Sequence, residues 1–240
     1  MASYFVRKLA RGAELADTDR ALMLHMSQST QRFNARRDIV VEGHEPRWLP
    51  LILEGWACRY SMLQNGNRQM ISLLLPGDLC EPFGMLSQFG GHTLSALTPV
   101  VVASVSTEAL RAAAQTSRAI ERALWWDLLF TTAVEREHIV SLGQRSASES
   151  LGHLFCELHL RLLTAGLIDG NQFELPLIQA DLGDLLGLST VHVNRSLQEL
   201  RKSGLIALKK RLLTIPHLER LREFSMFDQS HFPLGELPSR

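Results

Sequence analysis

Short apolar runs alternate with regularly spaced glycines between residues 33 and 105. Successive glycines are separated by 12, 11 and 11 positions, at Gly43, Gly55, Gly66 and Gly77. Strands separated by turns at intervals of roughly 8–12 residues are typical of an all-β sandwich or barrel. Bulky side chains recur at every second position from Trp56 to Met62, which predicts a strand with one buried face. The Asn65-Gly66 pair that follows is a hairpin signal, so we predict a β-roll of the jelly-roll type.

The apolar period becomes that of a helix after Val105. Neither glycine nor proline occurs between Ser117 and Gly143, and apolar residues recur every three or four positions. At 1.5 Å per residue the predicted helix is about 40 Å long. One stripe along it consists of Ile120, Leu124, Leu128, Thr131, Val134, His138 and Leu142. A second stripe consists of Trp125, Leu129, Ala133 and Val140.

Two stripes on one helix provide one face for the β-roll and one for a partner helix. Two copies of the helix side by side would form a C2 dimer, the commonest oligomeric symmetry. We assign the first stripe, residues 120–142, to the dimer interface. The alternative is a single helix buried within a monomer.

Residues 179–202 have the pattern of two helices joined by a tight turn. The inner faces carry Leu182, Leu185 and Leu186 in the first helix and Val193, Leu197 and Leu200 in the second. Gly183 leaves space where the helices cross, Gly187 tolerates a left-handed conformation, and Ser189 can cap the second helix. The pattern predicts a helix-turn-helix.

Two β-prone runs, 205–208 and 212–215, follow the helix-turn-helix. The residues between them are Lys209, Lys210 and Arg211, which makes the predicted hairpin a wing with a basic tip. Pro216 can begin a last short helix that ends at Phe224. The tail, residues 225–240, has no clear pattern and is expected to be mobile.

Charge supports DNA binding only locally. The whole chain holds 25 basic and 25 acidic residues, so its net charge is zero. Residues 175–224 hold eight Lys and Arg against five Asp and Glu, an excess of three. Phosphate contacts supply much of the affinity of a DNA-binding protein, so this excess favours DNA binding by the C-terminal part.

Cysteine usage and hydropathy indicate a cytoplasmic protein. The cysteines are widely separated and odd in number, which suggests neither a disulfide framework nor a metal site: Cys58, Cys80 and Cys156. No stretch approaches the roughly 20 apolar residues of a membrane span. Arg7, Lys8 and Arg11 interrupt what would be the apolar core of a signal peptide.

Several motifs, taken in order, resemble those of the Crp/Fnr superfamily, named for the cyclic-AMP receptor protein and the fumarate-nitrate reduction regulator. In the N-terminal part they are Glu42-Gly43, Ile52-Leu53-Glu54-Gly55, Asn65-Gly66 and Leu75-Pro76-Gly77-Asp78. In the C-terminal part they are Gln179-Ala180-Asp181-Leu182-Gly183, Val193-Asn194-Arg195 and Ser203-Gly204-Leu205-Ile206. The resemblance implies a homodimeric, signal-responsive regulator that binds a palindromic promoter site in double-stranded DNA and contacts RNA polymerase.

The resemblance also implies a domain order within an α+β fold. A cyclic-nucleotide-binding-like β-roll with an N-terminal helix would occupy residues 1–116, and the dimerisation helix with its hinge residues 117–145. A winged helix-turn-helix would occupy residues 146–224, followed by a tail at 225–240.

Departures from the family pattern bear on the effector. Members that bind cyclic nucleotides carry a Gly-Glu pair after the Pro-Gly-Asp turn and, further on, an Arg that pairs with the phosphate. Here Cys80-Glu81 stands at the first place and Gly90-Gly91-His92 at the second, without Lys or Arg between Asp78 and Val105. A buried phosphate needs a charge-assisted partner. We therefore expect no cyclic nucleotide in the possible effector pocket, which consists of Cys80, Glu81, Gly90 and His92.

The family pattern also bears on an iron–sulfur cluster and on haem. Iron–sulfur members of the family carry clustered N-terminal cysteines, and no cysteine precedes Cys58, which argues against a cluster. His25, His44 and His92 leave haem open as an alternative. We predict no bound metal and no cofactor.

The second helix of the helix-turn-helix is the predicted reading element. Its DNA-facing residues are predicted to be Ser189, Thr190, Val191, His192, Asn194, Arg195 and Gln198, joined by Lys209, Lys210 and Arg211 from the wing. Arg195 can bind guanine or phosphate, whereas Asn194 and Gln198 can read adenine. The family usually has a Glu where Val191 stands, so a thymine methyl is the contact left to Val191. The alternative is a solvated helix face.

Two functions of other classes remain as alternatives. A cupin-like metalloenzyme would need closely spaced histidines, and no HxH or HxxxH pair occurs between residues 33 and 105. A signalling adaptor that does not bind DNA would leave the glycine-jointed helix pair and the basic hairpin unexplained. We therefore expect a DNA-binding regulator without enzymatic activity.

Overall fold

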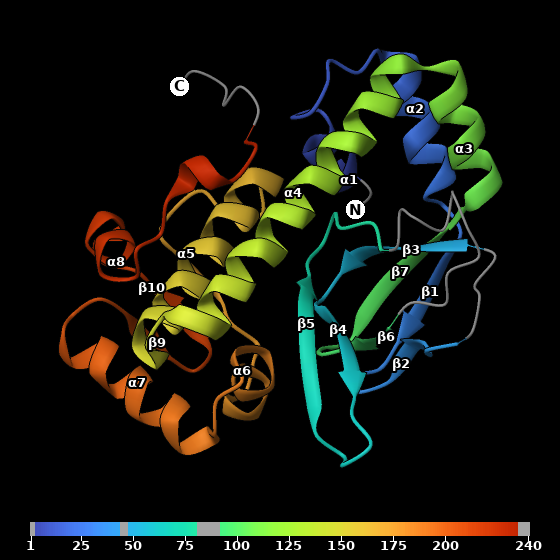
Figure 1. Ribbon diagram of the computed structural model, residues 1–240. Coiled ribbons are helices and arrows are strands. Elements are labelled where there is room, and N and C mark those ends of the chain that lie inside the picture. The colour runs from blue at the N-terminus through green and yellow to red at the C-terminus, as the bar shows by residue number, and fades with distance from the viewer. Residues whose placement is uncertain (1–2, 44–47, 81–91, 235–240) are drawn as a thin grey trace. The chain divides into compact units, whose positions relative to one another are not determined.

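The computed structural model describes residues 3–43, 48–80 and 92–234 (Figure 1). The chain separates into two compact units. The first comprises residues 1–61, 72–131 and 233–240, and the second comprises residues 62–71 and 132–232. A long helix, α4 (Arg118–Gln144), contributes residues to both units.

Two sheets form a β-roll in the N-terminal half of the chain, with strand orders β1-β7-β3 and β2-β6-β4-β5. The strands are β1 Thr30–Phe33, β2 Asp38–Val40, β3 Trp48–Glu54, β4 Ala57–Met62, β5 Arg68–Leu74, β6 Thr93–Ala96 and β7 Val100–Ser106. Apolar side chains from the two sheets meet in a shared core that includes Ile52, Ala57, Leu94, Ala96, Val100 and Val102.

Helices pack on the opposite face of the sheet β1-β7-β3. They are α1 Ser3–Leu9, α2 Asp17–Met26, α3 Thr107–Thr116 and the first half of α4. Their core with the sheet includes Phe5, Leu9, Met23, Leu49, Leu51, Leu53, Leu110, Ile120 and Leu124. Strand β3 is therefore buried on both faces, which explains why its apolar run is continuous rather than alternating.

A buried ion cluster ties α1 to α4 within the first unit. The Lys8 Nζ lies 2.6 Å from Asp78 Oδ1 and 2.6 Å from Asp127 Oδ1. Burial lowers the pKa of Lys8, but the carboxylates of Asp127 and Asp78 outweigh this effect and raise the pKa to about 12. Removal of one partner would leave a buried charge unpaired. The cluster therefore fixes α1 against α4 and against the segment that carries Asp78.

The second unit contains a winged helix-turn-helix built around one buried helix, α5 (Ala147–Ala165), which contacts three helices that follow it in the chain. These are α6 Gln179–Leu186, α7 Thr190–Lys202 and α8 Leu218–Phe224. A small sheet of order β8-β10-β9 completes the unit, with β8 Gln172–Glu174, β9 Ala207–Lys209 and β10 Leu212–Thr214. A short 3-10 helix, η2 (Gln229–His231), follows α8.

The predicted fold class is confirmed, and so are the four glycine turns of the β-roll. Gly43, Gly55, Gly66 and Gly77 all have positive φ. The predicted alternation in β4 is wrong in part. Ala57 and Cys58 are both fully buried, whereas Met62 is 53% exposed. Strand β4 begins in the core between the two sheets and ends in solvent. The burial of its side chains therefore decreases along the strand instead of alternating.

Three boundaries differ from those expected. Helix α4 continues through Gly143 to Gln144, and α8 begins at Leu218 rather than at Pro216. Residues 225–232 of the tail, which was expected to be mobile, pack against the rest of the second unit although they have no clear pattern in sequence. Ser225, Phe227 and Phe232 are buried there, because apolar contacts with distant helices order a segment that has no local period of its own.

Candidate DNA interface

The turn between α6 and α7 is built by glycine and a capping serine, as the sequence predicts. Gly187 ends α6 with φ of 65°, a left-handed conformation that glycine adopts without steric cost. A Cβ on Gly183 would lie 2.6 Å from the carbonyl oxygen of Leu188, so any side chain there would force the turn open. The Ser189 hydroxyl accepts a hydrogen bond from His192 N at 3.3 Å and caps α7.

Helix α7 divides cleanly into a buried and an exposed face. The buried face carries Val193, Ser196, Leu197 and Leu200. The exposed face carries every predicted reading residue of the helix: Thr190, Val191, His192, Asn194, Arg195 and Gln198. Val191 is 73% exposed, which is unusual for a valine and leaves its methyl groups available to a partner.

Five of the exposed residues line a shallow groove of about 420 Å³, namely Thr190, Val191, Asn194, Arg195 and Gln198, with Gln179. Gln179 is exposed at the first position of α6, and the sequence reasoning missed it as a site residue. Its place at the start of the first helix of the motif was the available signal. The Gln198 side-chain amide donates to Asn194 Oδ1 at 2.8 Å, so each amide fixes the orientation of the other.

Contacts with α5 fix the orientation of α7. The Ser148 hydroxyl donates to a carboxylate oxygen of Glu199, which lies on α7. Helix α7 is also among the main packing partners of α5. A reading helix held on a rigid element keeps its side chains in one geometry, which is what discrimination between base pairs requires.

The wing is a hairpin with a two-residue tip. Lys209 pairs with Leu212 across the strands, so Lys210 and Arg211 alone form the turn. Their φ values, 47° and 70°, are those of a type I′ turn, in which Asn-Gly is the usual sequence. Two exposed cations stand here in a conformation that disfavours side chains. The predicted basic tip is confirmed, with Lys209 as the last residue of β9 rather than part of the loop.

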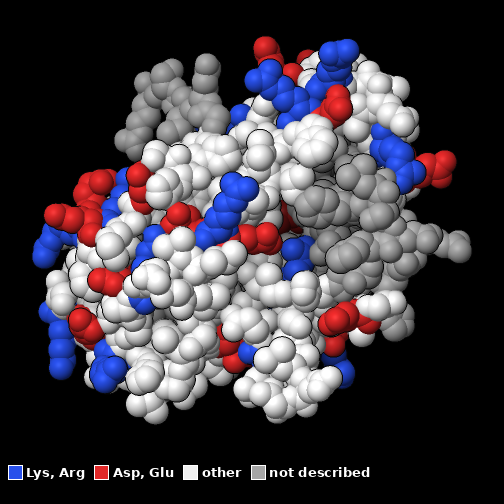
Figure 2. Space-filling view, viewed as in Figure 1, with Lys and Arg blue, Asp and Glu red and all other residues white. Residues whose placement is uncertain are grey.

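Basic side chains are not gathered into one continuous surface on the side seen in Figure 2. Basic and acidic side chains are interspersed over the second unit in that view. Within this unit, Arg195 on α7 and the wing residues Lys209, Lys210 and Arg211 are all exposed.

Helix α4 also has an exposed face, and it is not the one expected. Ile120, Leu124 and Val134 of the predicted dimer stripe are buried in this chain alone, and Ile120 and Leu124 belong to the core beneath α1 to α3. Leu128, Thr131 and His138 are half-buried, and Leu142 is exposed. Trp125, Leu129 and Val140 of the second stripe are exposed, whereas Ala133 of that stripe is buried. Ile139, which belongs to neither stripe, is exposed as well.

The predicted effector residues are only partly described. Cys80 is buried in the β-roll core, and His92 is exposed. Glu81 and Gly90 lie outside the described residues. No group of three or more potential metal ligands is present within residues 3–43, 48–80 and 92–234. No helix in the described part of the chain is long and apolar enough to cross a membrane.

Comparison with known proteins connects both units to one family. The model of the cyclic nucleotide-binding domain matches residues 30–117, and the model of the Crp-like helix-turn-helix domain matches residues 150–224. Together they cover the β-roll and the winged helix-turn-helix in the order found here. The chain belongs to the Crp/Fnr superfamily and is a DNA-binding transcription regulator.

Curated relatives agree with this assignment. The transcriptional activator protein FnrL of Cereibacter sphaeroides is 25% identical over 211 residues, which is 86% of this chain and 84% of the relative. The nitrogen fixation regulation protein FixK of Bradyrhizobium diazoefficiens is 29% identical over 160 residues, 65% of each chain.

A solved structure supports the fold. FixK2 from Bradyrhizobium japonicum superposes with a TM-score of 0.67 at 23% identity, covering 88% of this chain and 98% of FixK2. At this identity the likeness shows the fold alone.

Proposed function

We propose that this regulator acts as a homodimer that places one α7 helix in each of two neighbouring major grooves of a palindromic promoter site. The exposed polar face of α7 carries the proposal. Its residues combine a planar cation, Arg195, with two amides, Asn194 and Gln198, and these groups match the hydrogen-bonding edges of guanine and adenine.

Different parts of the second unit then have different roles. Arg195 and its neighbours on α7 read bases, whereas Lys209, Lys210 and Arg211 contact the phosphate backbone beside the groove. Phosphate contacts carry no sequence information, but they set register and supply affinity. Gln179 joins the phosphate-contacting group, because it lines the groove from the start of α6 rather than from the face of α7.

The exposed apolar face of α4, which combines Trp125 and Leu129 of the second stripe with Ile139, is the proposed dimer interface. Trp125, Leu129 and Ile139 are 56%, 57% and 67% exposed. Their spacing of four and ten residues, 125 to 129 and 129 to 139, keeps them on one side of a helix. Large apolar residues along one exposed face favour burial against another protein surface. A second copy of α4 provides the same face, and C2 is the commonest symmetry of homo-oligomers.

The experiment is selection from randomised DNA. The purified chain is incubated with a library of random duplexes, and the enriched sequences are read after several rounds. A dimer with two recognition helices should enrich a palindrome with half-site centres about 10 bp apart, one turn of the double helix. Enrichment of a single asymmetric site, or of no sequence, would contradict the proposed mode of binding.

We also propose that the regulator does not respond to cyclic nucleotides and acts at promoters through contact with RNA polymerase. The segment between Asp78 and Val105 offers no Lys or Arg to a phosphate. Calorimetry with cyclic AMP at millimolar concentration should therefore give no saturable heat. A one-to-one isotherm with Kd below roughly 10 μM would show that another residue binds the phosphate.

A further inference from the structure

A segment after α8 packs against the joint between α4 and α5. This segment, Met226–Phe232, is called the C-terminal clasp here. Phe227 and Phe232 are buried, and their rings stack with centroids 5.3 Å apart. Phe227 also lies against the His153 ring of α5 at 5.0 Å. The clasp therefore has a core of its own that includes a residue of α5.

The joint itself is organised by one buried carboxylate. Glu137 of α4 lies 2.7 Å from Arg145 Nη2 and 3.2 Å from His153 Nε2 through its Oε2 atom. Its second oxygen, Oε1, lies 2.8 Å from His231 Nδ1 of the clasp. Burial raises the pKa of Glu137, but hydrogen bonds from Arg145 and His231 outweigh burial and hold the pKa below its ordinary value. One ionised side chain thus binds the end of α4, the joint, α5 and the clasp.

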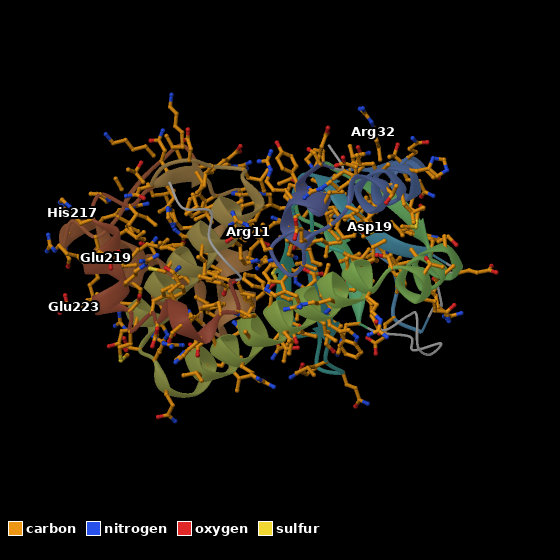
Figure 3. The ribbon with its side chains drawn as sticks, turned by 90° about the horizontal axis from the view of Figure 1, so that it is seen from above. Arg11, Asp19, Arg32, His217, Glu219 and Glu223 are labelled. Atoms are coloured by element: carbon orange, nitrogen blue, oxygen red, sulfur yellow. The ribbon has the colours of Figure 1, made fainter. Side chains whose placement is uncertain are left out.

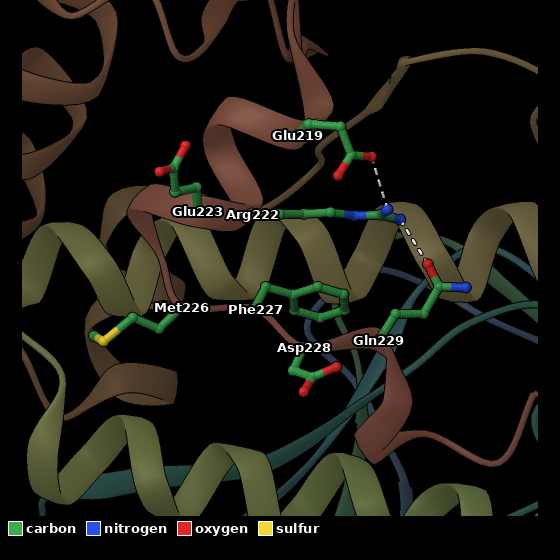
Figure 4. A pocket seen from close by; sticks show the side chains of 7 residues that line it. All are labelled: Glu219, Arg222, Glu223, Met226, Phe227, Asp228 and Gln229. Atoms are coloured by element: carbon green, nitrogen blue, oxygen red, sulfur yellow. Dashed lines mark hydrogen bonds and ion pairs between the residues drawn. The ribbon is translucent and has the colours of Figure 1, made fainter.

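The clasp is anchored on its other side by α8. Figure 4 shows Arg222 between Glu219 and Gln229, with Phe227 beside its guanidinium. The Arg222 Nη1 donates to Glu219 at 2.9 Å and the Nη2 to Gln229 at 2.9 Å. The guanidinium carbon lies 5.9 Å from the centre of the Phe227 ring. These contacts direct the clasp back toward α4.

Helix α5 transmits this arrangement to the reading helix. The chain before the clasp approaches α5 closely at Gly152. A Cβ on Gly152 would lie 3.0 Å from the Cβ of Ser225, the residue before the clasp. Ser148, near the start of α5, hydrogen-bonds Glu199 on α7. An element that fixes the direction in which α5 leaves α4 therefore also fixes where α7 stands.

We propose that the C-terminal clasp, through the contact of His231 with Glu137, is a positioning element that sets the separation of the two recognition helices in the dimer. This inference rests on the proposed function. His231 does not touch DNA in this scheme; it acts through the α4–α5 joint. Its loss should leave each α7 able to bind its half-site and should loosen the spacing between the two.

The test compares three variants on a set of duplexes. His231→Ala removes the contact with Glu137, and His231→Asn retains an N–H donor near the place of Nδ1. His217→Ala is the control, because His217 is an exposed histidine at the start of α8 (Figure 3). The duplexes are the site selected from random DNA, the same site with one or two base pairs added to or removed from its centre, and a single half-site.

Loss of preorganisation predicts a specific pattern of affinities. His231→Ala should bind the native spacing about tenfold more weakly than the wild type, with half-site affinity unchanged within about twofold. It should also discriminate less than the wild type between native and altered spacing. His231→Asn should restore the wild-type preference, and His217→Ala should never lose it.

Three results would count against the inference. Equal weakening of His231→Ala on all duplexes would show a general loss of folded protein, which thermal unfolding would register as well. A sharp spacing preference retained by His231→Ala would overturn the inference and leave the proposed function intact. A wild-type chain without spacing preference would overturn both.

Discussion

Helices α4 and α7 are both amphipathic along their length, yet they expose opposite chemistry. The exposed face of α7 is polar and carries a cation and two amides, whereas the exposed face of α4 presents Trp125, Leu129 and Ile139. A polar face with fixed hydrogen-bonding groups suits the edges of base pairs. An apolar face suits a protein surface. The solvent-exposed residues of a helix thus indicate which class of partner it binds.

The buried faces of the two helices differ as well. Helix α7 buries only Val193, Ser196, Leu197 and Leu200. Helix α4 buries apolar residues in its first half and also two carboxylates, Asp127 and Glu137. Buried charge is tolerated only when it is paired, so α4 depends on specific partners where α7 depends on packing.

The largest expected effect separates the buried face of α4 from its exposed apolar face. Leu124→Ala should lower the free energy of unfolding by about 2–5 kcal/mol, because Leu124 lies in the core of the first unit. Leu129→Glu with Ile139→Glu should instead leave the fold intact and convert the dimer to a monomer, since each pair of symmetry-related glutamates would be buried without a partner. Chemical denaturation and analytical ultracentrifugation measure the two quantities.

Two substitutions on α3 serve as the matched control for the exposed apolar face. Ala112→Glu with Gln115→Glu adds the same charge at exposed positions of a different helix and should leave the dimer unchanged. If the variant at Leu129 and Ile139 still sediments as a dimer, the interface lies elsewhere.

A second prediction concerns the buried ionisable groups at the joint between α4 and α5. Burial lowers the pKa of His153 to about 4 and also lowers the pKa values of His138 and His159. Between about pH 6.5 and 4, His153 is neutral in the folded chain but takes up a proton in the unfolded chain, and the shifts of His138 and His159 act in the same direction. The stability that these histidines contribute is therefore complete above about pH 7. It is lost as the pH falls from 6.5 toward 4, by at most about 1.4 kcal/mol per pH unit from His153.

The variant His153→Phe keeps a ring against Phe227 and removes the titrating group. Its free energy of unfolding, measured by urea denaturation between pH 4 and 7, should depend less steeply on pH than that of the wild type. His217→Phe, at an exposed position, should keep the wild-type slope. An unchanged slope in His153→Phe would show that His153 is not responsible.

A smaller effect is expected at the wing. Lys210→Asn with Arg211→Gly places the usual type I′ residues in the turn and should raise the free energy of unfolding by about 1–2 kcal/mol, since side chains disfavour the left-handed conformation. The same change removes two phosphate contacts, so the plot of log affinity against log salt should become shallower by roughly two. A variant that is more stable and binds DNA as well as the wild type would show that the wing does not touch the backbone.

The helix-turn-helix could be predicted from the sequence because its determinants are local. Gly183, Gly187 and Ser189 each act on neighbours within a few residues, and the inner faces follow a simple period. The same holds for the glycine turns of the β-roll and for the basic tip of the wing.

What could not be predicted depends on contacts between distant residues. Both stripes of α4 are largely apolar in sequence, so only the fold shows that Leu124 faces the core and Leu129 faces outward. The clasp has no period of its own, and the partner of His231, Glu137, lies 94 residues away. Gln179 was missed because its role comes from the groove that α7 forms beside it.

The most direct test of the account compares Arg195→Ala with Lys210→Ala on the selected site and on a scrambled duplex at several salt concentrations. Arg195 is assigned to base reading, where one bidentate contact to guanine contributes about 1–3 kcal/mol of discrimination. Arg195→Ala should therefore lose most of the preference for the selected site. Lys210→Ala should weaken binding to both duplexes equally and lower the salt slope by roughly one. If Arg195→Ala keeps the wild-type ratio of affinities, α7 does not read DNA through Arg195 and the central claim is contradicted.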